Sequence, residues 1–403
     1  MIISILSIGD EILAGDTTNT NSTWISRELT KIGGKVDRQI TCQDETKEII
    51  SSLSYLKNFN PNYIIITGGL GPTDDDITRK TLFDYFKVDE KFDKEYWDEL
   101  VSRFKKLNIQ IVESNKSQAI IPSIGEVLPN LIGSARGYCF LQEGTSFFSL
   151  PGVPKEMKEM MKHSILPRVA KNISNPIFRK LIRTTGVPES TLAEKIIKIT
   201  ESNHDCKIGY YPSVHGVDIR LSGTSMNKVE KLFIALQNIF GDISYADRKI
   251  SIEEVIVKHL ILKKKTISVA ESCTGGLIMH RITNTSNSSK ILNGGVITYS
   301  NESKTQFLGI PSNLILDKGA VSKQVAGEMS SRVMSKFGTD YGISVTGIAG
   351  PGGGTIEKPV GTVFISISSE HSTKVKKFMF GNDRERNKIR ASQAALNMLR
   401  LSI

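Results

Sequence analysis

Three side chains that can together hydrolyse an amide lie near the ends of two expected strands. Residues 266–270 form a β-rich run that stops just before Ser272, and a second apolar run, 295–299, ends in Tyr299, with Lys304 five residues later. Serine, tyrosine and lysine can supply a nucleophile, a proton relay and a base without a histidine, and Ser–Lys pairs are a variant of the catalytic triad. We therefore expect Ser272 to be the nucleophile and Lys304 the base, with Tyr299 relaying the proton or orienting the pair.

Two alternatives compete for the same turn. Cys273 is a second possible nucleophile, because a thiol beside the start of a helix can lose its proton, but His280 lies two turns along that helix and offers no obvious base. Ser272 could also simply cap the helix expected from Leu277. Ser272 is preferred to both alternatives, and the backbone N–H groups of residues 273–276 are expected to stabilise the oxyanion.

The first part of the chain alternates strand-like and helical segments. Residues 2–8, 35–42 and 63–67 are predicted strands, and Asn21 or Ser22 is predicted to cap the helix after the first of them. The third run is almost wholly apolar, which is typical of a parallel strand covered on both faces. This alternation predicts a doubly wound parallel sheet, which binds ligands at the carboxyl ends of its strands.

A glycine-rich segment, TGGLGPTDDDITR, follows the third of these strands at residues 67–79. Its glycines allow backbone N–H groups to approach an anion, and carboxylates at a phosphate site recruit Mg²⁺. The carboxylates could instead cap the next helix, but three in a row exceed what capping needs. The expected anion-binding residues are Gly68, Gly69 and Gly71, and the expected metal ligands are Asp74, Asp75, Asp76 and, from another strand end, Glu11.

The composition indicates an ordinary globular protein with two or three domains. No apolar run approaches the roughly 20 residues of a membrane span, so no membrane partner is expected. Four scattered cysteines and a start without signal-peptide features indicate the reducing cytoplasm. The net charge is +10, but the lysines are spread along the chain without interleaved aromatic residues, so we expect a solvated basic surface and no nucleic acid partner.

Five segments of the last 150 or so residues resemble the deamidase domain of the CinA family: AESCTGG (270–276), VITYSNESK (296–304), GAVS (319–322), VTGIAGPGGG (345–354) and EKPVGTV (357–363). Members of that family hydrolyse the carboxamide of nicotinamide mononucleotide to give nicotinate mononucleotide and ammonia. The resemblance implies this substrate, no cofactor for the reaction, and catalytic roles for Ser272 and Lys304 assisted by Tyr299.

Substrate contacts are expected from three places in the same domain. The turn after Ser272 and a second glycine-rich strand end can donate to an anion, and one arginine matches a position that the family places near the substrate. The expected residues are Thr274, Gly275, Gly276, Thr346, Gly347 and Arg384. Lys388, which follows in the same basic stretch, is expected to lie on solvated surface.

The N-terminal part is similar to the MoaB/MogA-like molybdopterin-binding fold found in CinA proteins. The segments that carry this resemblance are 9–21, 67–79, 113–122, 128–137 and 150–157. The resemblance implies hydrolysis of ADP-ribose with a divalent metal such as Mg²⁺ or Co²⁺. Residues 133–137 read GSARG, so that Arg136 stands where the family pattern has a loop proline.

Between these parts, residues 170–249 show a β-α-β-β-α-like pattern that resembles the K-homology-like middle domain of long CinA proteins, although it lacks a GXXG loop. The sequence therefore predicts an α/β chain, expected as a homodimer. Its three predicted domains are a doubly wound MoaB/MogA-like domain (1–168), a small α+β K-homology-like domain (169–249) and an α/β deamidase domain (250–403). The alternative function is that of a non-catalytic pterin- or nucleotide-binding competence/damage-inducible protein.

Overall fold

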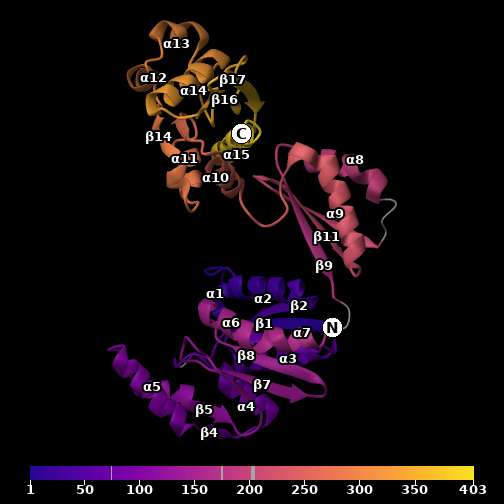
Figure 1. Cartoon of the computed structure of the whole chain (residues 1–403). Helices are drawn as coiled ribbons and strands as arrows, with labels where there is room; N and C mark the ends of the chain where they lie inside the picture. The colour runs from indigo at the N-terminus through magenta and orange to yellow at the C-terminus, as the bar shows by residue number, and fades with distance from the viewer. Residues whose placement is uncertain (74, 174–175, 201–204) are drawn as a thin grey trace. The chain divides into compact units, whose positions relative to one another are not determined.

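The computed structural model describes residues 1–73, 75–173, 176–200 and 205–403. The chain divides into two compact units, Met1–Phe178 and Arg179–Ile403 (Figure 1). Within the described ranges, no helix is long and apolar enough to cross a membrane. The second unit contains two sheets, one for the predicted middle domain and one for the predicted deamidase domain, whose exact boundaries stay a prediction.

The first unit is built on a six-stranded sheet with the strand order β2-β1-β3-β8-β7-β6. The first four of these strands are parallel, and β7 and β6 continue the sheet in antiparallel pairing. The strands are β1 (Ile2–Ile8), β2 (Lys35–Cys42), β3 (Tyr63–Thr67), β6 (Glu126–Leu128), β7 (Gly137–Gln142) and β8 (Thr145–Leu150). A separate two-stranded sheet pairs β4 (Glu90–Phe92) with β5 (Ile120–Pro122).

Helices cover both faces of this sheet, so the predicted doubly wound architecture is confirmed. The apolar sides of α3 and α4 pack on one face, and those of α2, α6 and α7 pack on the other. The helices are α1 (Asp10–Leu13), α2 (Thr20–Lys31), α3 (Thr46–Lys57), α4 (Thr78–Phe86), α5 (Lys94–Lys106), α6 (Pro154–Met160) and α7 (Leu166–Lys171).

The predicted cap of α2, Asn21 or Ser22, is wrong by two or three residues. The cap is Asn19, whose side chain accepts a hydrogen bond from the Ser22 N–H at 3.0 Å. Asn21 lies inside the first turn and donates instead to the hydroxyl of Thr67, at 3.2 Å, and to the carbonyl of Gly152, at 2.7 Å. Residues 19–22 are four polar residues in a row, and only the contacts with the sheet distinguish them.

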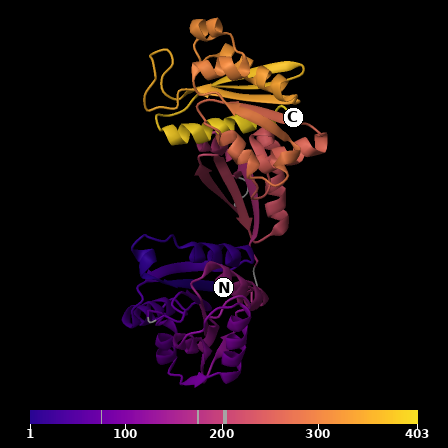
Figure 2. The same ribbon diagram turned by 90° about the vertical axis from the view of Figure 1, so that its left-hand side faces the viewer.

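The predicted small α+β domain is a four-stranded sheet with the order β10-β11-β9-β12. The helices α8 and α9 pack on one of its faces (Figures 1 and 2). Its elements are β9 (Phe178–Thr184), α8 (Glu189–Thr200), β10 (Cys206–Ser213), β11 (Gly216–Gly223), α9 (Met226–Phe240) and β12 (Ser244–Ala246). The order of elements is the predicted β-α-β-β-α pattern with one short strand added.

The last sheet has the order β14-β13-β15-β16-β17, with the first three strands parallel. Its strands are β13 (Ile267–Glu271), β14 (Leu292–Ile297), β15 (Tyr341–Gly347), β16 (Thr362–Ser369) and β17 (Ser372–Met379). One face packs against α10 (Ile252–Lys263), α11 (Leu277–Thr283) and α15 (Arg384–Arg400). The other face packs against α12 (Asn301–Leu308), α13 (Ser312–Lys318) and α14 (Lys323–Phe337).

The second strand of this sheet, β13, has parallel neighbours on both sides. The chain leaves β13 through α11 to reach β14 and then returns through α12, α13 and α14 to reach β15 on the other side. The strand order therefore reverses at β13, and open α/β sheets bind ligands at such a reversal, beyond the carboxyl end of the strand. Ser272 is the first residue after that end.

Gly342 allows α14 to pack directly on β15. A Cβ at Gly342 would lie 2.0 Å from the carbonyl oxygen of Ser330 on α14. We therefore expect Gly342→Ala to lower the free energy of unfolding by about 1–3 kcal/mol through overpacking. Gly327→Ala, on the same helix, is the matched control, since its Cβ would meet only side-chain methyl groups at 3.6 Å. Urea unfolding should show a clearly larger loss of unfolding free energy for Gly342→Ala than for Gly327→Ala. Equal losses in the two variants would contradict the prediction.

Candidate active site

The structure brings Ser272 and Lys304 together. Ser272 follows the carboxyl end of β13, and Lys304 lies in the first turn of α12, which Ser300 caps. The amine Nζ of Lys304 lies 3.2 Å from the hydroxyl Oγ of Ser272. Both side chains are buried, Lys304 to 1% exposure. The two residues are thus placed as a nucleophile and its base require.

Burial makes the Lys304 amine easier to deprotonate than a lysine in water. Its Nζ donates to the carbonyl oxygen of Thr298 at 2.8 Å and lies 3.4 Å from that of Tyr299. No carboxylate in the described part of the chain forms an ion pair with it. Burial lowers the pKa of Lys304 from 10.5, with Cys273 and Glu302 acting in the opposite direction. A neutral amine keeps a lone pair that can accept the Ser272 proton.

Cys273 does not compete as a nucleophile. Its side chain is 6% exposed, and burial raises the pKa of the thiol to about 12. The thiolate, which is the reactive form, is therefore scarce at neutral pH. The preference for Ser272 gains physical support from this burial.

The turn that carries Ser272 is held by Glu271, which sequence reasoning missed. The fully buried Glu271 carboxylate accepts backbone hydrogen bonds from Gly276 at 3.0 Å, Ile278 at 3.1 Å and Met279 at 2.9 Å. Three N–H donors at the start of α11 satisfy the charge. One feature of the sequence could have indicated this role: Glu271 is an acidic residue at the end of an otherwise apolar strand, directly before the serine.

These bonds correct the expected oxyanion donors. The Gly276 N–H is bound to Glu271, and the Gly275 N–H donates to the carbonyl of Ser272 at 3.0 Å, so neither is free. Gly275 and Gly276 are required instead for the turn, because their φ angles are +61° and +93°. In the described chain, the N–H groups of Cys273 and Thr274 have no hydrogen-bond partner, which leaves these two to face a developing oxyanion.

Tyr299 contacts the expected substrate arginine and not the reacting pair. Its hydroxyl accepts a hydrogen bond from Nη2 of Arg384 at 2.7 Å, and Nη1 of Arg384 donates to the Gly350 carbonyl at 2.7 Å. Among the described residues, the phenol makes no contact with Ser272 or Lys304, so the predicted proton relay through it is not formed. Tyr299 is 60% exposed, and its ring and Arg384 border the site.

The remaining predicted contacts in this domain are mostly structural. The hydroxyl of Thr346 donates to the carbonyl of Ala320 at 2.9 Å, and a substrate contact at Thr346 stays a prediction. Gly347 allows β16 to approach, because a Cβ there would lie 2.7 Å from Cγ2 of Val363. Thr274 is fully buried, and within the described chain its hydroxyl has no partner.

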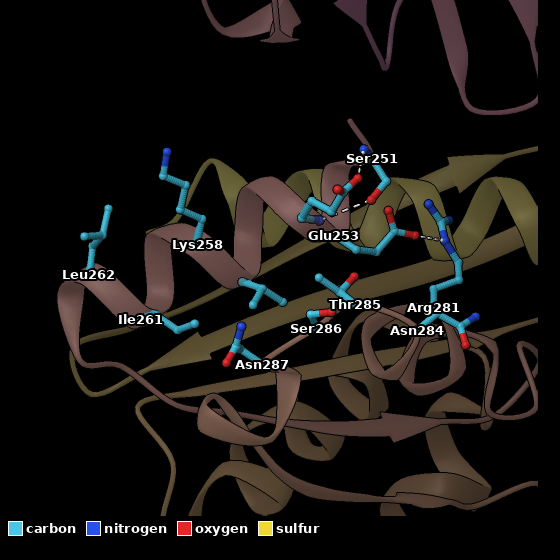
Figure 3. A pocket seen from close by; sticks show the side chains of 12 residues that line it. Ser251, Glu253, Lys258, Ile261, Leu262, Arg281, Asn284, Thr285, Ser286 and Asn287 are labelled. Carbon is cyan, nitrogen blue, oxygen red and sulfur yellow. Dashed lines mark hydrogen bonds and ion pairs between the residues drawn. The ribbon is translucent and has the colours of Figure 1, made fainter. Parts of the chain in front are cut away.

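A cavity of about 660 Å³ in this domain lies away from the Ser272 turn (Figure 3). It is bordered by α10 and by the loop that follows α11, and it contains none of the predicted site residues. On its wall Glu253 and Arg281 point toward each other and form a buried ion pair. Because Arg281 is fully bonded, we assign this pair to the packing of α10 and α11.

In the first unit, Glu11 and Gly68 border one small cavity of about 130 Å³. This agrees with the expectation that residues following the ends of parallel strands meet at one edge of the sheet. Asn21, which sequence reasoning missed, lines the same cavity, and its buried Oδ1 has no partner in the described chain. Gly69 lies against the hydroxyl of Thr78, and Gly71 lies beneath the Asp76 carboxylate, where a Cβ would be 2.4 Å from Oδ2. Gly71 therefore makes room for Asp76, and anion binding by its backbone N–H stays a prediction.

The predicted metal carboxylates do not behave alike. Asp74 lies outside the described residues, and Asp76 accepts a hydrogen bond from the Thr73 N–H at 3.0 Å. Neither Asp75 nor Asp76 caps α4, whose cap residue, Ile77, makes no side-chain bond. The described residues contain no ready group of three metal-ligating side chains.

A further carboxylate, Asp44, extends this acidic edge. Burial raises the pKa of Asp44, and Asp10, Glu11 and Asp75 raise it further. Burial is the first cause of this shift, and the neighbouring carboxylates add to it. Hard oxygen ligands of this kind are those that Mg²⁺ and similar divalent cations prefer. The set fits a cation held by one or two carboxylates that is completed by substrate and water.

Arg136, which departs from the family pattern, anchors its loop. It is 7% exposed, its Nη1 donates to Oδ2 of Asp93 at 2.6 Å, and its guanidinium lies 3.8 Å from the centre of the Tyr96 ring. The pKa of Asp93 is lowered, first by the hydrogen bond from Arg136. The loop is therefore fixed to α5 by an ion pair and a cation–π contact.

Lys304→Met should change how stability depends on pH. Between the lowered pKa of the folded protein and 10.5, the unfolded chain binds one more proton at Lys304 than the folded chain. The wild-type free energy of unfolding should thus gain up to about 1.4 kcal/mol per pH unit from this residue as pH rises through that window. The variant lacks that gain. Urea unfolding at several pH values below 10.5 measures it, and parallel pH curves would rule out a lowered pKa.

Three family descriptions together match most of the chain. Residues 4–171 match the "Probable molybdopterin binding domain", 179–246 the "Damage-inducible protein CinA KH domain" and 249–403 the "CinA C-terminal domain". Among solved structures, the competence/damage inducible protein CihA from Agrobacterium tumefaciens is 32% identical, covers 38% of this chain and 96% of its own, and has a TM-score of 0.36.

Relatives also match over the full length. A CinA-like protein of Flavobacterium psychrophilum is 40% identical over 413 residues, which cover 99% of this chain and 98% of that protein. A putative competence-damage inducible protein of Clostridium perfringens is 36% identical, with 99% of this chain and 98% of that protein covered. On this evidence the chain belongs to the CinA family.

Proposed function

We propose that the Ser272–Lys304 site hydrolyses the carboxamide of nicotinamide mononucleotide to nicotinate mononucleotide and ammonia. The observation that carries the proposal is the 3.2 Å contact between the Ser272 hydroxyl and a lysine whose pKa is lowered by burial. The substrate comes from the resemblance of the site motifs to the CinA deamidase domain. The reaction is amide hydrolysis, in which one water is consumed.

In the acylation step, Lys304 takes the Ser272 proton while Oγ bonds to the carboxamide carbon. The carbonyl electron pair moves to oxygen, where the free N–H groups of Cys273 and Thr274 stabilise it. Lys304, now protonated, gives its proton to the amide nitrogen. The C–N bond then breaks, and ammonia leaves an ester between the nicotinoyl carbon and Ser272.

Deacylation uses the same groups, with water as the nucleophile. Lys304 takes a proton from water, the hydroxide oxygen bonds to the ester carbon, and the same two N–H groups stabilise the oxyanion. The bond to Ser272 breaks, and Oγ recovers a proton from Lys304. One lysine thus acts as base and acid in turn, as in other sites without histidine.

Ser272→Ala should lower ammonia release from nicotinamide mononucleotide at least about a thousandfold, because the nucleophile is lost. Lys304→Ala should have a similar effect, and the double variant should lose little more, since the two residues act as a unit. Cys273→Ala is the matched control and should stay within several-fold of wild type. A coupled ammonia assay measures all four proteins. Full activity in Ser272→Ala would refute the mechanism, and a folded, inactive wild type would favour the non-catalytic binding alternative.

For the first unit we propose metal-dependent hydrolysis of ADP-ribose at the edge that carries Glu11, Asp44 and Asp75. The observation that favours it is that Asp44, whose pKa is raised first by burial, lies near the carboxylates of Glu11 and Asp75, which raise it further. A bound Mg²⁺ or Co²⁺ would neutralise charge on the pyrophosphate. One or two of the carboxylates of Glu11, Asp44 and Asp75 would hold the cation, while the small cavity beside Asn21 and Gly68 would receive part of the substrate.

Asp75→Asn should raise the metal concentration needed for half-maximal ADP-ribose hydrolysis by about tenfold or more, because a ligand charge is removed. Asp98→Asn, which alters an exposed carboxylate paired with Lys94 on α5, is the control and should leave the metal response unchanged. Metal titration of the hydrolysis rate makes the comparison. If both variants respond to metal as wild type does, Asp75 is not a ligand.

A further inference from the structure

The proposed deamidase substrate carries a phosphate, and the backbone donors nearest Ser272 cannot bind it. The N–H groups of Gly276, Ile278 and Met279 already donate to the Glu271 carboxylate. That buried negative charge also repels a phosphate monoester, which carries a charge of about −1.5 to −2 at neutral pH. A positive side chain from a neighbouring element has to supply the attraction.

The start of α15 brings two cations to this turn. Arg384 and Lys388 are one helical turn apart and share a face. Arg384 already donates to the Tyr299 hydroxyl and to the Gly350 carbonyl. The Nζ of Lys388 lies 3.9 Å from the position that a Cβ on Gly275 would take. In the described chain, Lys388 has no carboxylate within ion-pair distance, so its charge is free for a ligand.

Two sets of contacts hold Lys388 in this place. On the Lys388 side of the helix, Arg281 from α11 donates to Ser392 at 2.8 Å and to Gln393 at 2.6 Å. One residue before Lys388, the buried Asn387 donates to the carbonyl of Ala349 at 3.0 Å. The backbone at Lys388 is therefore fixed against the Ser272 turn. The expectation that Lys388 lies on solvated surface is wrong, because its side chain is half-buried.

We propose that Lys388 binds the phosphate monoester of the substrate and gives this site its preference for a nucleotide over the corresponding nucleoside. The inference rests on the proposed deamidase function. A lysine ammonium is a compact charge with three donors and is a common phosphate ligand. The Lys388 amine lies beside Gly275, three residues beyond the nucleophile, so an anion bound there lies beside the reacting carboxamide without a contact to the reacting atoms. Lys388 is thus a specificity residue and takes no part in the bond changes.

The test compares nicotinamide mononucleotide with nicotinamide riboside in the full-length protein. Lys388→Met keeps the apolar stem and removes the charge. It should lower kcat/KM for the nucleotide by roughly 10- to 100-fold, mainly through KM, because charge-assisted hydrogen bonds have about this effect on binding. The kcat/KM of this variant for the riboside should stay within about threefold of the wild-type value. Lys388→Arg should keep most of the preference, and Arg386→Ala, an equal charge loss at an exposed position of the same helix, should behave as wild type.

Equal losses on both substrates would overturn the proposal, because they would show that Lys388 supports the fold of the site. Unchanged nucleotide kinetics in Lys388→Met would overturn it as well. Should the wild type release ammonia from neither substrate, the deamidase function itself fails. The anion site is then judged separately by thermal unfolding in inorganic phosphate. Phosphate should raise the wild-type melting temperature more than that of Lys388→Met, and equal shifts in both would reject Lys388 as the anion ligand.

Discussion

The chemistry of the second unit depends on an amine that is buried without a negative partner. Desolvation disfavours the ammonium form, and a nearby carboxylate would reverse that effect. Lys304 is surrounded by the Ser272 hydroxyl and by backbone carbonyls, which accept hydrogen bonds without adding a full negative charge. The buried carboxylate closest in sequence to the nucleophile, Glu271, is bonded to the start of α11. The site therefore combines an amine whose pKa is lowered by burial with a carboxylate whose oxygens accept three backbone hydrogen bonds.

Much of this arrangement could be predicted from the sequence, because strand ends in a parallel sheet meet at one edge. The apolar run before Ser272 and the run that ends near Tyr299 were enough to place Ser272 and Lys304 near each other. The two covered faces of the first sheet followed in the same way from alternating strands and helices. Such predictions depend only on the residues of one strand or helix and of the next one in the chain. They can therefore be made without knowing any long-range contact.

The parts that could not be predicted are contacts that depend on helix register or on competition for one donor. Nothing local distinguishes Glu271 as the acceptor for three N–H groups, although this removes Gly276 from the expected oxyanion site. Lys388 reaches Gly275 only because α15 is fixed along its length by α11 and a distant loop. Asp44 joins Glu11 only once β1 and β2 are paired. The substitution at Arg136 similarly has a partner, Asp93, that no local pattern indicates.

The burial of Cys273 has a consequence for how the protein responds to oxidative stress. A thiol whose pKa is about 12 is almost wholly protonated in the cell, and peroxides and alkylating agents react with the thiolate. Cys273, directly after the proposed nucleophile, is thus expected to react slowly with these reagents. A cysteine at the start of a helix commonly has the opposite property and senses oxidants. The turn thus places a sulfur atom next to the hydroxyl that we propose as the nucleophile, while burial protects that sulfur from oxidation.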